Sequence, residues 1–138
     1  SDKEKFEAFK RRAVEANEEQ YGKEIREQYG PEAVEESNAR LLSMTEEEHG
    51  RWKALEAEIL SALAAAVRAG EAPAGPEGRR IAQLHRRWLC CTWAKYTPQA
   101  HRGVAELYTA DERFAAYYDK EVPGCAAFLR DAVRAYTE

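Results

Sequence analysis

Apolar residues recur every three or four positions along almost the whole chain, and no segment shows the strict alternation of a half-buried strand. The clearest apolar stripe runs from Trp52 to Val67, and Gly70 follows its end. The β-branched residues that favour strands are few. The periodicity therefore predicts an all-α domain of about seven helices.

Residues that cap or break helices place the boundaries in the first half. Gly30 and Pro31 end a long charged N-terminal helix and begin a short helix that reaches Leu42. Thr45 and Glu48 have the spacing of a capping box, in which a hydroxyl and a carboxylate accept hydrogen bonds from free backbone amides. We expect the helix of the clearest stripe to begin at this box.

The second half begins with a connection, residues 71–78, that is rich in Gly and Pro. We expect a helix from Gly78 to Lys95. Thr97 and Pro98 then suit the N-cap and the first position of another helix.

The C-terminal tail carries two more start signals. Thr109 and Glu112 stand three apart like a second capping box, so we expect one helix to end near Tyr108 and another to begin near Ala110. Pro123 suits the first turn of a final helix because it lacks a backbone donor.

Length and the distribution of apolar residues indicate one domain with an uneven core. A chain of 138 residues is long enough for one real core and short for two. Residues 1–43 carry only a thin apolar stripe, while nine of the fourteen aromatic residues follow Gly70. We expect 1–43 to be mobile N-terminal helices and 44–138 to be the stable core, within a single domain 1–138.

The overall charge argues against a nucleic-acid surface, because the net charge is -4 and the pI is near 5.5. No apolar run approaches the roughly 20 residues of a membrane span, and no secretory signal opens the sequence. We expect a cytoplasmic location. Adjacent Cys90 and Cys91, together with Cys125, are expected to be reduced and mostly buried thiols.

Catalysis and metal binding have little support in the sequence. His49, His85 and His101 are scattered, and there is no nucleophile elbow and no Gly-rich phosphate loop. His85 with Cys90 and Cys91 matches no standard zinc spacing. We therefore predict no enzyme activity, no cofactor and no metal.

One face of the predicted helix 78–95 combines aromatic rings with polar tips. His85, Trp88, Thr92 and Tyr96 stand at i, i+3, i+7 and i+11. Such a stripe is more often core than ligand site, although a large, partly apolar ligand would need this kind of lining. Both interpretations stay open on the residues alone.

Several motifs in the right order resemble a known family. LYTADERF and PGCAAFLRDAV follow HRRW without gaps, and KFEAF, EIREQYG, the ES of EESNAR and MTEEEHGRW precede them. This pattern resembles the TipA-type antibiotic-recognition domain (TipAS), the effector module of thiostrepton-induced MerR-like regulators.

The resemblance implies a globin-like helical domain with a ligand cleft between a mobile N-terminal part and a stable C-terminal part. Its ligand would be a large, thiopeptide-like antibiotic bound noncovalently. In such regulators a helix-turn-helix that binds DNA and a dimerising coiled coil precede the domain, so we expect the isolated sensing half. The ligand-contact residues we expect are His85, Trp88, Thr92, Tyr96, Gly103, Leu107, Tyr108, Phe114 and Tyr117.

One position departs from the family pattern. Members that capture thiopeptides covalently use a Cys just upstream of this signature, and the matching position here is Gly103. We therefore expect noncovalent binding. A stand-alone protein that sequesters a drug and a structural helical interaction domain remain the alternatives.

Overall fold

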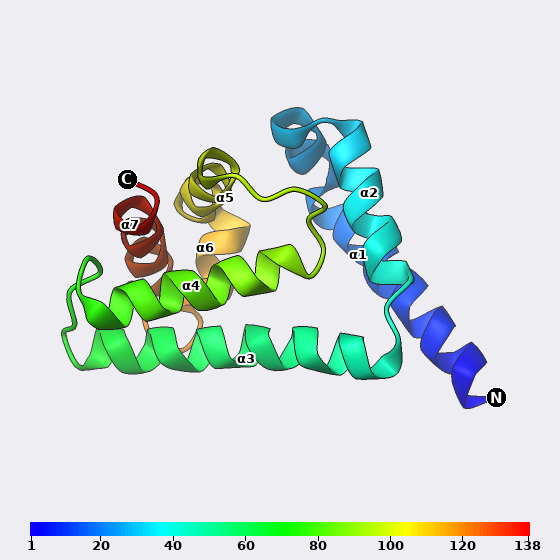
Figure 1. Ribbon diagram of the computed structural model, residues 1–138, viewed down its shortest axis with the longest axis horizontal. Helices are drawn as coiled ribbons and strands as arrows, with labels where there is room; N and C mark the ends of the chain where they lie inside the picture. Colours follow the sequence, from blue (N-terminus) through cyan, green and yellow to red (C-terminus); the bar gives the residue numbers. More distant parts are fainter. The chain divides into compact units, whose positions relative to one another are not determined.

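The computed structural model describes residues 1–138 and contains seven helices and no strand, which confirms the all-α prediction (Figure 1). In chain order the helices are α1 (Asp2–Tyr29), α2 (Pro31–Leu42), α3 (Glu46–Arg68), α4 (Pro76–Cys90), α5 (Pro98–Ala110), α6 (Glu112–Asp119) and α7 (Cys125–Tyr136). None of them combines the length and the apolar character needed to cross a membrane.

Two of the predicted helix starts are confirmed by their capping hydrogen bonds. Thr45 Oγ1 accepts from the Glu48 amide at 3.1 Å, and Glu48 Oε1 accepts from the Thr45 amide at 2.9 Å. Thr97 Oγ1 accepts from the Ala100 amide at 3.1 Å, with Pro98 in the first turn of α5. Both caps satisfy backbone donors that have no partner within the helix.

The predicted break between the first two helices is also confirmed. Gly30 has φ 87°, a backbone conformation that is easy only for glycine, and Pro31 begins α2 directly after it. The Gly30 amide still bonds to the Arg26 carbonyl at 2.8 Å, so α1 ends in an ordinary last turn.

The predicted helix 78–95 is wrong at its C-terminal end. α4 ends at Cys90, where the amides of Thr92 and Trp93 both bond to the Leu89 carbonyl. Pro98 disfavours a helical conformation at the residue before it, and Thr97 is extended with φ -135°. The chain must therefore leave the helix before α5 can begin. As a result, Thr92 and Tyr96 do not lie on α4 with His85 and Trp88.

The second predicted capping box is wrong as well. α5 continues to Ala110, and Asp111 caps α6 by accepting from the Arg113 amide at 2.9 Å. A carboxylate is the stronger acceptor at a helix N-terminus because it also meets the positive end of the helix dipole. Thr109 instead donates its hydroxyl to the Glu106 carbonyl at 3.3 Å.

The final helix begins two residues after the predicted proline. Gly124 has φ 100° and precedes Cys125, the first residue of α7. The Asp119 carboxylate accepts from the Ala126 amide at 2.8 Å and so caps α7 from the end of α6. A left-handed residue at this position turns the chain, which Pro123 with its fixed φ could not do.

The chain divides into two compact units. The first unit comprises Ser1–Trp52 and Leu89–Lys95, and the second comprises Lys53–Trp88 and Tyr96–Glu138. The expected boundary between residues 43 and 44 stays a prediction.

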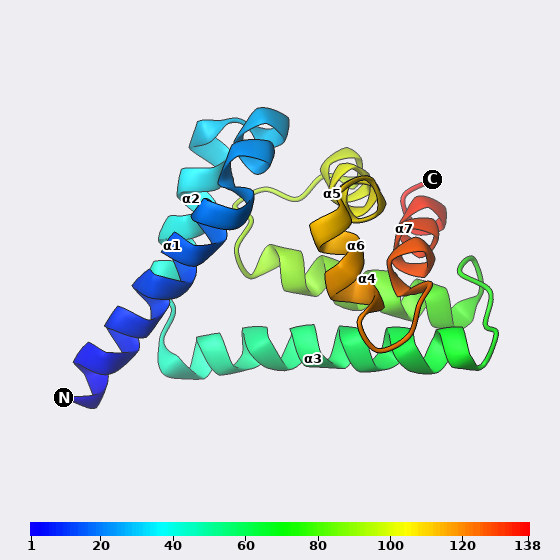
Figure 2. The ribbon, with the colours of Figure 1, turned by 180° about the vertical axis from the view of Figure 1, so that it is seen from behind.

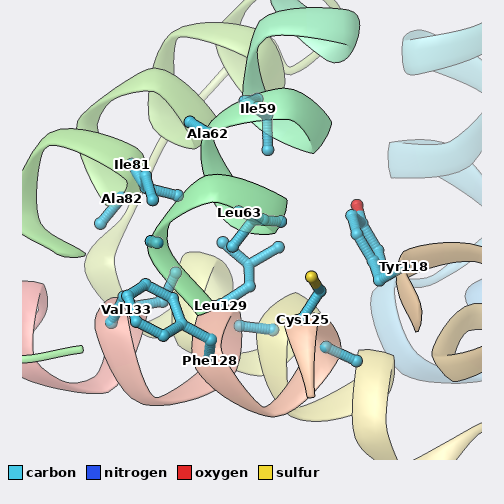
Figure 3. Packing of buried hydrophobic residues seen from close by; sticks show 14 of the residues in the cluster. Ile59, Ala62, Leu63, Ile81, Ala82, Tyr118, Cys125, Phe128, Leu129 and Val133 are labelled. Carbon is cyan, nitrogen blue, oxygen red and sulfur yellow. The ribbon is translucent and has the colours of Figure 1, made fainter. Parts of the chain in front are cut away.

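The second unit is built on one apolar cluster to which α3, α4, α5, α6 and α7 all contribute. Figures 1 and 2 show α3 and α4 side by side, joined by the short connection between them. Leu63, Ile81, Leu129 and Val133 are completely buried. In Figure 3, Leu63 of α3 lies against Leu129 of α7. Burying a leucine side chain fully stabilises a fold by roughly 1.5 to 3 kcal/mol.

The first unit has a much smaller apolar core. α1 packs on α2, yet among residues 1–52 only Val34 and Met44 are buried hydrophobics. Gly22 is buried, and the Glu18 carboxylate lies so close to it that a side chain at this position would collide with the carboxylate. That carboxylate binds Arg26 at 2.9 Å and accepts from Asn38 of α2 at 2.8 Å. Polar contacts thus join the two helices.

A buried lysine ties α1 to the end of α2. The Lys10 side chain is only 1% exposed, and its Nζ donates to the carbonyls of Leu42 and Met44, both at 2.7 Å. It also pairs with Glu7 at 3.1 Å and lies 4.5 Å from the centre of the Phe6 ring. The ammonium group satisfies the Leu42 carbonyl, at the C-terminus of α2 and so at the negative end of its helix dipole, and the Met44 carbonyl in the connection to α3.

We expect the first 43 residues to exchange their amide hydrogens faster than α7 in the ligand-free protein. Ordering a residue costs roughly 1 to 2 kcal/mol of backbone entropy, and this segment buries little apolar surface against that cost. Hydrogen exchange read by mass spectrometry checks this. Protection of residues 1–43 as strong as that of α7 would contradict it.

Candidate functional site

A chain of polar side chains runs through the interior of the second unit. His85 Nδ1 lies 2.8 Å from His101 Nε2, and His85 Nε2 lies 3.0 Å from the Tyr108 hydroxyl. At the other end, the Tyr96 hydroxyl lies 2.7 Å from His101 Nδ1. We call these four residues the imidazole chain.

The helices position the members of the imidazole chain. α4 carries His85 on the same side as the buried Ile81 and Leu84. α5 carries His101 and Tyr108 two turns apart on one face. Both histidines are 0% exposed. Of the two interpretations that the sequence left open for His85, the structure therefore supports a residue of the core.

Burial keeps both imidazoles uncharged at neutral pH. Desolvation, and then the neighbouring His101, hold the pKa of His85 well below its ordinary value. Desolvation, and then the charge of Arg86, lower the pKa of His101 to about 4. Burial also raises the pKa of Tyr108 and Tyr118, so their hydroxyls stay protonated. The histidine and tyrosine side chains enclosed in the second unit are therefore neutral hydrogen-bonding groups.

Arg86 is exposed at the surface of α4, where it contacts two aromatic residues. Its guanidinium lies 4.1 Å from the centre of the Tyr96 ring, a cation–π contact. Its Nη1 donates to the Tyr136 hydroxyl at 3.2 Å. On the other side of α4, the Trp88 ring stacks on His85 with 5.6 Å between ring centres. Aromatic groups thus surround the imidazole chain.

A hollow of about 310 Å³ opens beside α5 in the second unit. Its volume is at the lower end of the range for small-molecule pockets. Arg102 Nε donates to the Thr137 hydroxyl at 3.1 Å, and Glu106 is paired with Arg134, so charges of both signs line it. The lining residues are Pro98, Gln99, Arg102, Gly103, Glu106 and Thr137.

The aromatic face of α6 packs on the core of the second unit. Phe114 and Tyr117 are partly buried against the apolar cluster, and Tyr118 is buried within it. The Tyr117 hydroxyl donates to the Glu56 carboxylate of α3, and the Lys120 ammonium lies 4.6 Å from the centre of the Tyr117 ring. This polar end of the ring distinguishes Tyr117 from its buried neighbours.

The structure separates the nine expected contact residues into three groups. His85 and Tyr108 are enclosed within the second unit. Thr92 belongs to the first unit. The others are partly exposed and belong to the second unit, namely Trp88, Tyr96, Gly103, Leu107, Phe114 and Tyr117.

Sequence reasoning missed His101 and Arg86 as parts of this site. The three histidines are scattered along the sequence, although His101 stands five residues after Tyr96 and seven residues, or two helical turns, before Tyr108. The spacing to Tyr108 was a usable signal. The contact of His101 with His85 has no signal, because the two residues are on different helices.

The expectation of mostly buried thiols is wrong for two of the three cysteines. Cys90 is exposed and Cys91 is partly exposed, because α4 ends there and the chain turns. Only Cys125 is buried, and burial raises the pKa of its thiol. No three histidine, cysteine or acidic side chains gather as metal ligands would.

Comparison with known proteins decides the family. The model of the TipAS antibiotic-recognition domain matches residues 21–136. The chain belongs to this family.

It is 34% identical over 134 residues to the HTH-type transcriptional activator TipA of Streptomyces coelicolor, covering 96% of this chain and 51% of that protein. It is 29% identical over 136 residues to the HTH-type transcriptional activator mta of Bacillus subtilis, with the same two coverages of 96% and 51%. The chain thus spans about half the length of the curated relatives it matches.

A solved structure supports the TipAS assignment. The structure of TipAS from Streptomyces lividans in complex with nosiheptide, a thiopeptide antibiotic, is 30% identical, with a TM-score of 0.73. The likeness covers 87% of this chain and 85% of that chain. The predicted globin-like, all-helical TipAS domain of about seven helices is confirmed.

We expect the TipAS domain to lose stability as the pH falls below about 6.5. Both histidines have a folded-state pKa below the unfolded value of about 6.5, so only the unfolded chain takes up their protons there. The contribution of His101 alone is about 2 kcal/mol lost by pH 5. Urea unfolding at a series of pH values measures this.

The control variants separate the buried pair from other titrating groups. His101→Gln should make stability fall less steeply between pH 7 and pH 5, because only His85 of the pair remains, while His49→Gln, in the first unit, should keep the slope due to His101. A wild-type stability that stays constant over this interval would contradict the assignment.

Proposed function

We propose that this TipAS domain is the antibiotic-sensing effector domain of a MerR-like transcription regulator. It binds a large, partly apolar, thiopeptide-like natural product noncovalently. The likeness to TipAS in complex with nosiheptide is the observation that carries this proposal. The sequence relatives cited above are transcriptional activators by name, which favours a regulator over a protein that only sequesters a drug.

The proposed contact surface consists of the partly exposed residues of the second unit. Trp88 and Tyr96 supply partly exposed rings, and Phe114 and Tyr117 add the aromatic face of α6. Leu107 and Gly103 extend the surface along α5, where Gly103 also lines the hollow. Large apolar ligands bind surfaces of this kind, in which a few polar groups fix the orientation.

The enclosed residues have another role in this proposal. His85 and Tyr108 have almost no exposed surface, so they act by holding their neighbours in place. Thr92 donates its hydroxyl to the Leu89 carbonyl at 3.4 Å and helps to end α4. It therefore shapes the connection between α4 and α5 more directly than it serves a ligand.

The proposed mechanism is a population shift in the first unit. Its helices depend on polar contacts and on few buried apolar residues. The difference in free energy between the ordered and the disordered first unit is therefore small. A ligand that binds the ordered state preferentially increases the population of that state. In the full regulator this ordered state is transmitted to a DNA-binding half.

The domain itself has no role in DNA binding or catalysis in this proposal. Its net charge of -4 disfavours phosphate contacts, so DNA is bound through the helix-turn-helix half of the regulator. Dimerisation belongs to a coiled coil of that half, and the regulator acts in the cytoplasm. No cofactor or metal takes part.

We expect nosiheptide to raise the thermal midpoint of the protein and to quench its tryptophan fluorescence. A ligand present at about 100 times its Kd, and binding only the native state, adds about 2.7 kcal/mol to the free energy of unfolding. Trp88→Ala should reduce the shift, whereas Gln83→Ala on the exposed side of α4 should not. No shift and no quenching with nosiheptide or thiostrepton would contradict the proposal.

A second expectation concerns covalent capture. The wild type should bind a thiopeptide that carries dehydroalanine without gaining mass, whereas Gly103→Cys should form an adduct. In the adduct the thiolate sulfur bonds to the alkene carbon, and the neighbouring carbon takes up a proton. Gly103 lies within α5 and has no positive φ, so its backbone conformation is one that cysteine adopts readily.

Intact-protein mass spectrometry reads out this reaction. The exposed Cys90 of the wild type is an internal control for unspecific alkylation. An adduct on the wild type would contradict noncovalent binding. A Gly103→Cys variant that binds the thiopeptide and stays unmodified would place Gly103 away from the reactive group.

A further inference from the structure

We propose that the buried His85–His101 pair is a positioning device for Tyr96 and, through it, a determinant of ligand affinity. The inference rests on the proposed function, because it assigns Tyr96 to ligand contact. Neither histidine touches the ligand. Of the imidazole chain, Tyr96 is the partly exposed member, while His85 and His101 are 0% exposed and Tyr108 is 3% exposed.

Tyr96 lies in the irregular segment between α4 and α5, where no helical hydrogen-bond ladder holds it. Two contacts from the second unit fix its ring. His101 Nδ1 lies 2.7 Å from the hydroxyl, and the Arg86 guanidinium lies 4.1 Å from the ring centre. The rings of Tyr96 and His101 meet edge to face at 5.4 Å. A loop residue is thus held by groups of the core.

The imidazole chain can form only when the two tautomers match. With both protons on Nδ1, His85 donates to His101, and His101 donates to Tyr96. With both protons on Nε2, every bond of the chain reverses. In a mixed pair, two N–H groups or two lone pairs would face each other across 2.8 Å. Each histidine therefore fixes the protonated nitrogen of the other.

This coupling explains how the core restrains a loop. If Tyr96 swings away, His101 Nδ1 loses its partner in a buried position, where an unsatisfied polar group is costly. His85 cannot compensate, since its two nitrogens already face His101 and Tyr108. The restraint on Tyr96 therefore comes from the complete chain. A pre-positioned side chain loses less conformational freedom when a ligand binds.

A double-mutant cycle on nosiheptide affinity tests the proposal, with Tyr96→Phe and His101→Gln as the single variants. We expect each to weaken binding by about tenfold, as the loss of one hydrogen bond does. The double variant should bind no more weakly than the weaker single variant, because His101 acts only through Tyr96. Gln83→Ala, on the exposed side of α4, is the control.

Three outcomes overturn the proposal. The first is a double variant whose affinity for nosiheptide falls by the full product of the two single effects, about a hundredfold. The second is nosiheptide binding that neither single variant weakens. The third comes from nitrogen-15 NMR of the imidazoles in the ligand-free wild type, which should show matched tautomers. A mixed pair of tautomers would overturn the proposal even if His101→Gln fails to fold. In that case His101→Asn replaces His101→Gln in the double-mutant cycle.

Failure of the proposed function has a different signature. If the wild type binds no thiopeptide while its histidine tautomers match, the imidazole chain exists and the ligand assignment of Tyr96 is wrong. If the wild type binds nosiheptide while the tautomers are mixed, the proposed function stands and the positioning role is wrong.

Discussion

The second unit depends on one constraint: the polar groups enclosed in its apolar core must stay uncharged and fully paired. His85 and His101 are surrounded by side chains such as Ile81 and Leu84, so a proton on either imidazole would be an uncompensated buried charge. Tyr108 and Tyr96 complete the pairing at the two ends. The constraint links α4 to α5 and to the segment between them by hydrogen bonds.

The two units differ in what stabilises them. Five helices of the second unit share one cluster of buried apolar residues, whereas the first unit relies on Lys10, on the Glu18 carboxylate and on three buried hydrophobics. Hydrogen bonds and exposed ion pairs contribute less per group than apolar burial, because water competes for the same partners. One chain can therefore combine a rigid unit with a unit whose order changes more easily.

The TipAS assignment gives these differences a meaning. In the proposed sensor, the aromatic residues of the second unit supply a preformed surface, and the first unit supplies the part whose order changes. Gly103 sets the chemistry of that surface, since a position without a thiol can bind but cannot capture. The hollow that Gly103 lines carries both Arg102 and Glu106, so it suits a ligand with polar as well as apolar parts.

The all-α class, most helix boundaries and the family follow from the amino-acid sequence, because helical periodicity, caps at Thr45 and Thr97 and short motifs are local properties. It failed at the end of α4 and at the start of α6, where Pro98 and Asp111 outweighed a plausible stripe and a plausible capping box. The sequence predicts Trp88 and Tyr96 as ligand contacts, but it does not predict that His101 and Arg86 hold Tyr96. The contacts of His85 with His101 and of Arg86 with Tyr96 depend on how α4 and α5 pack in three dimensions, because they join residues that no local pattern connects.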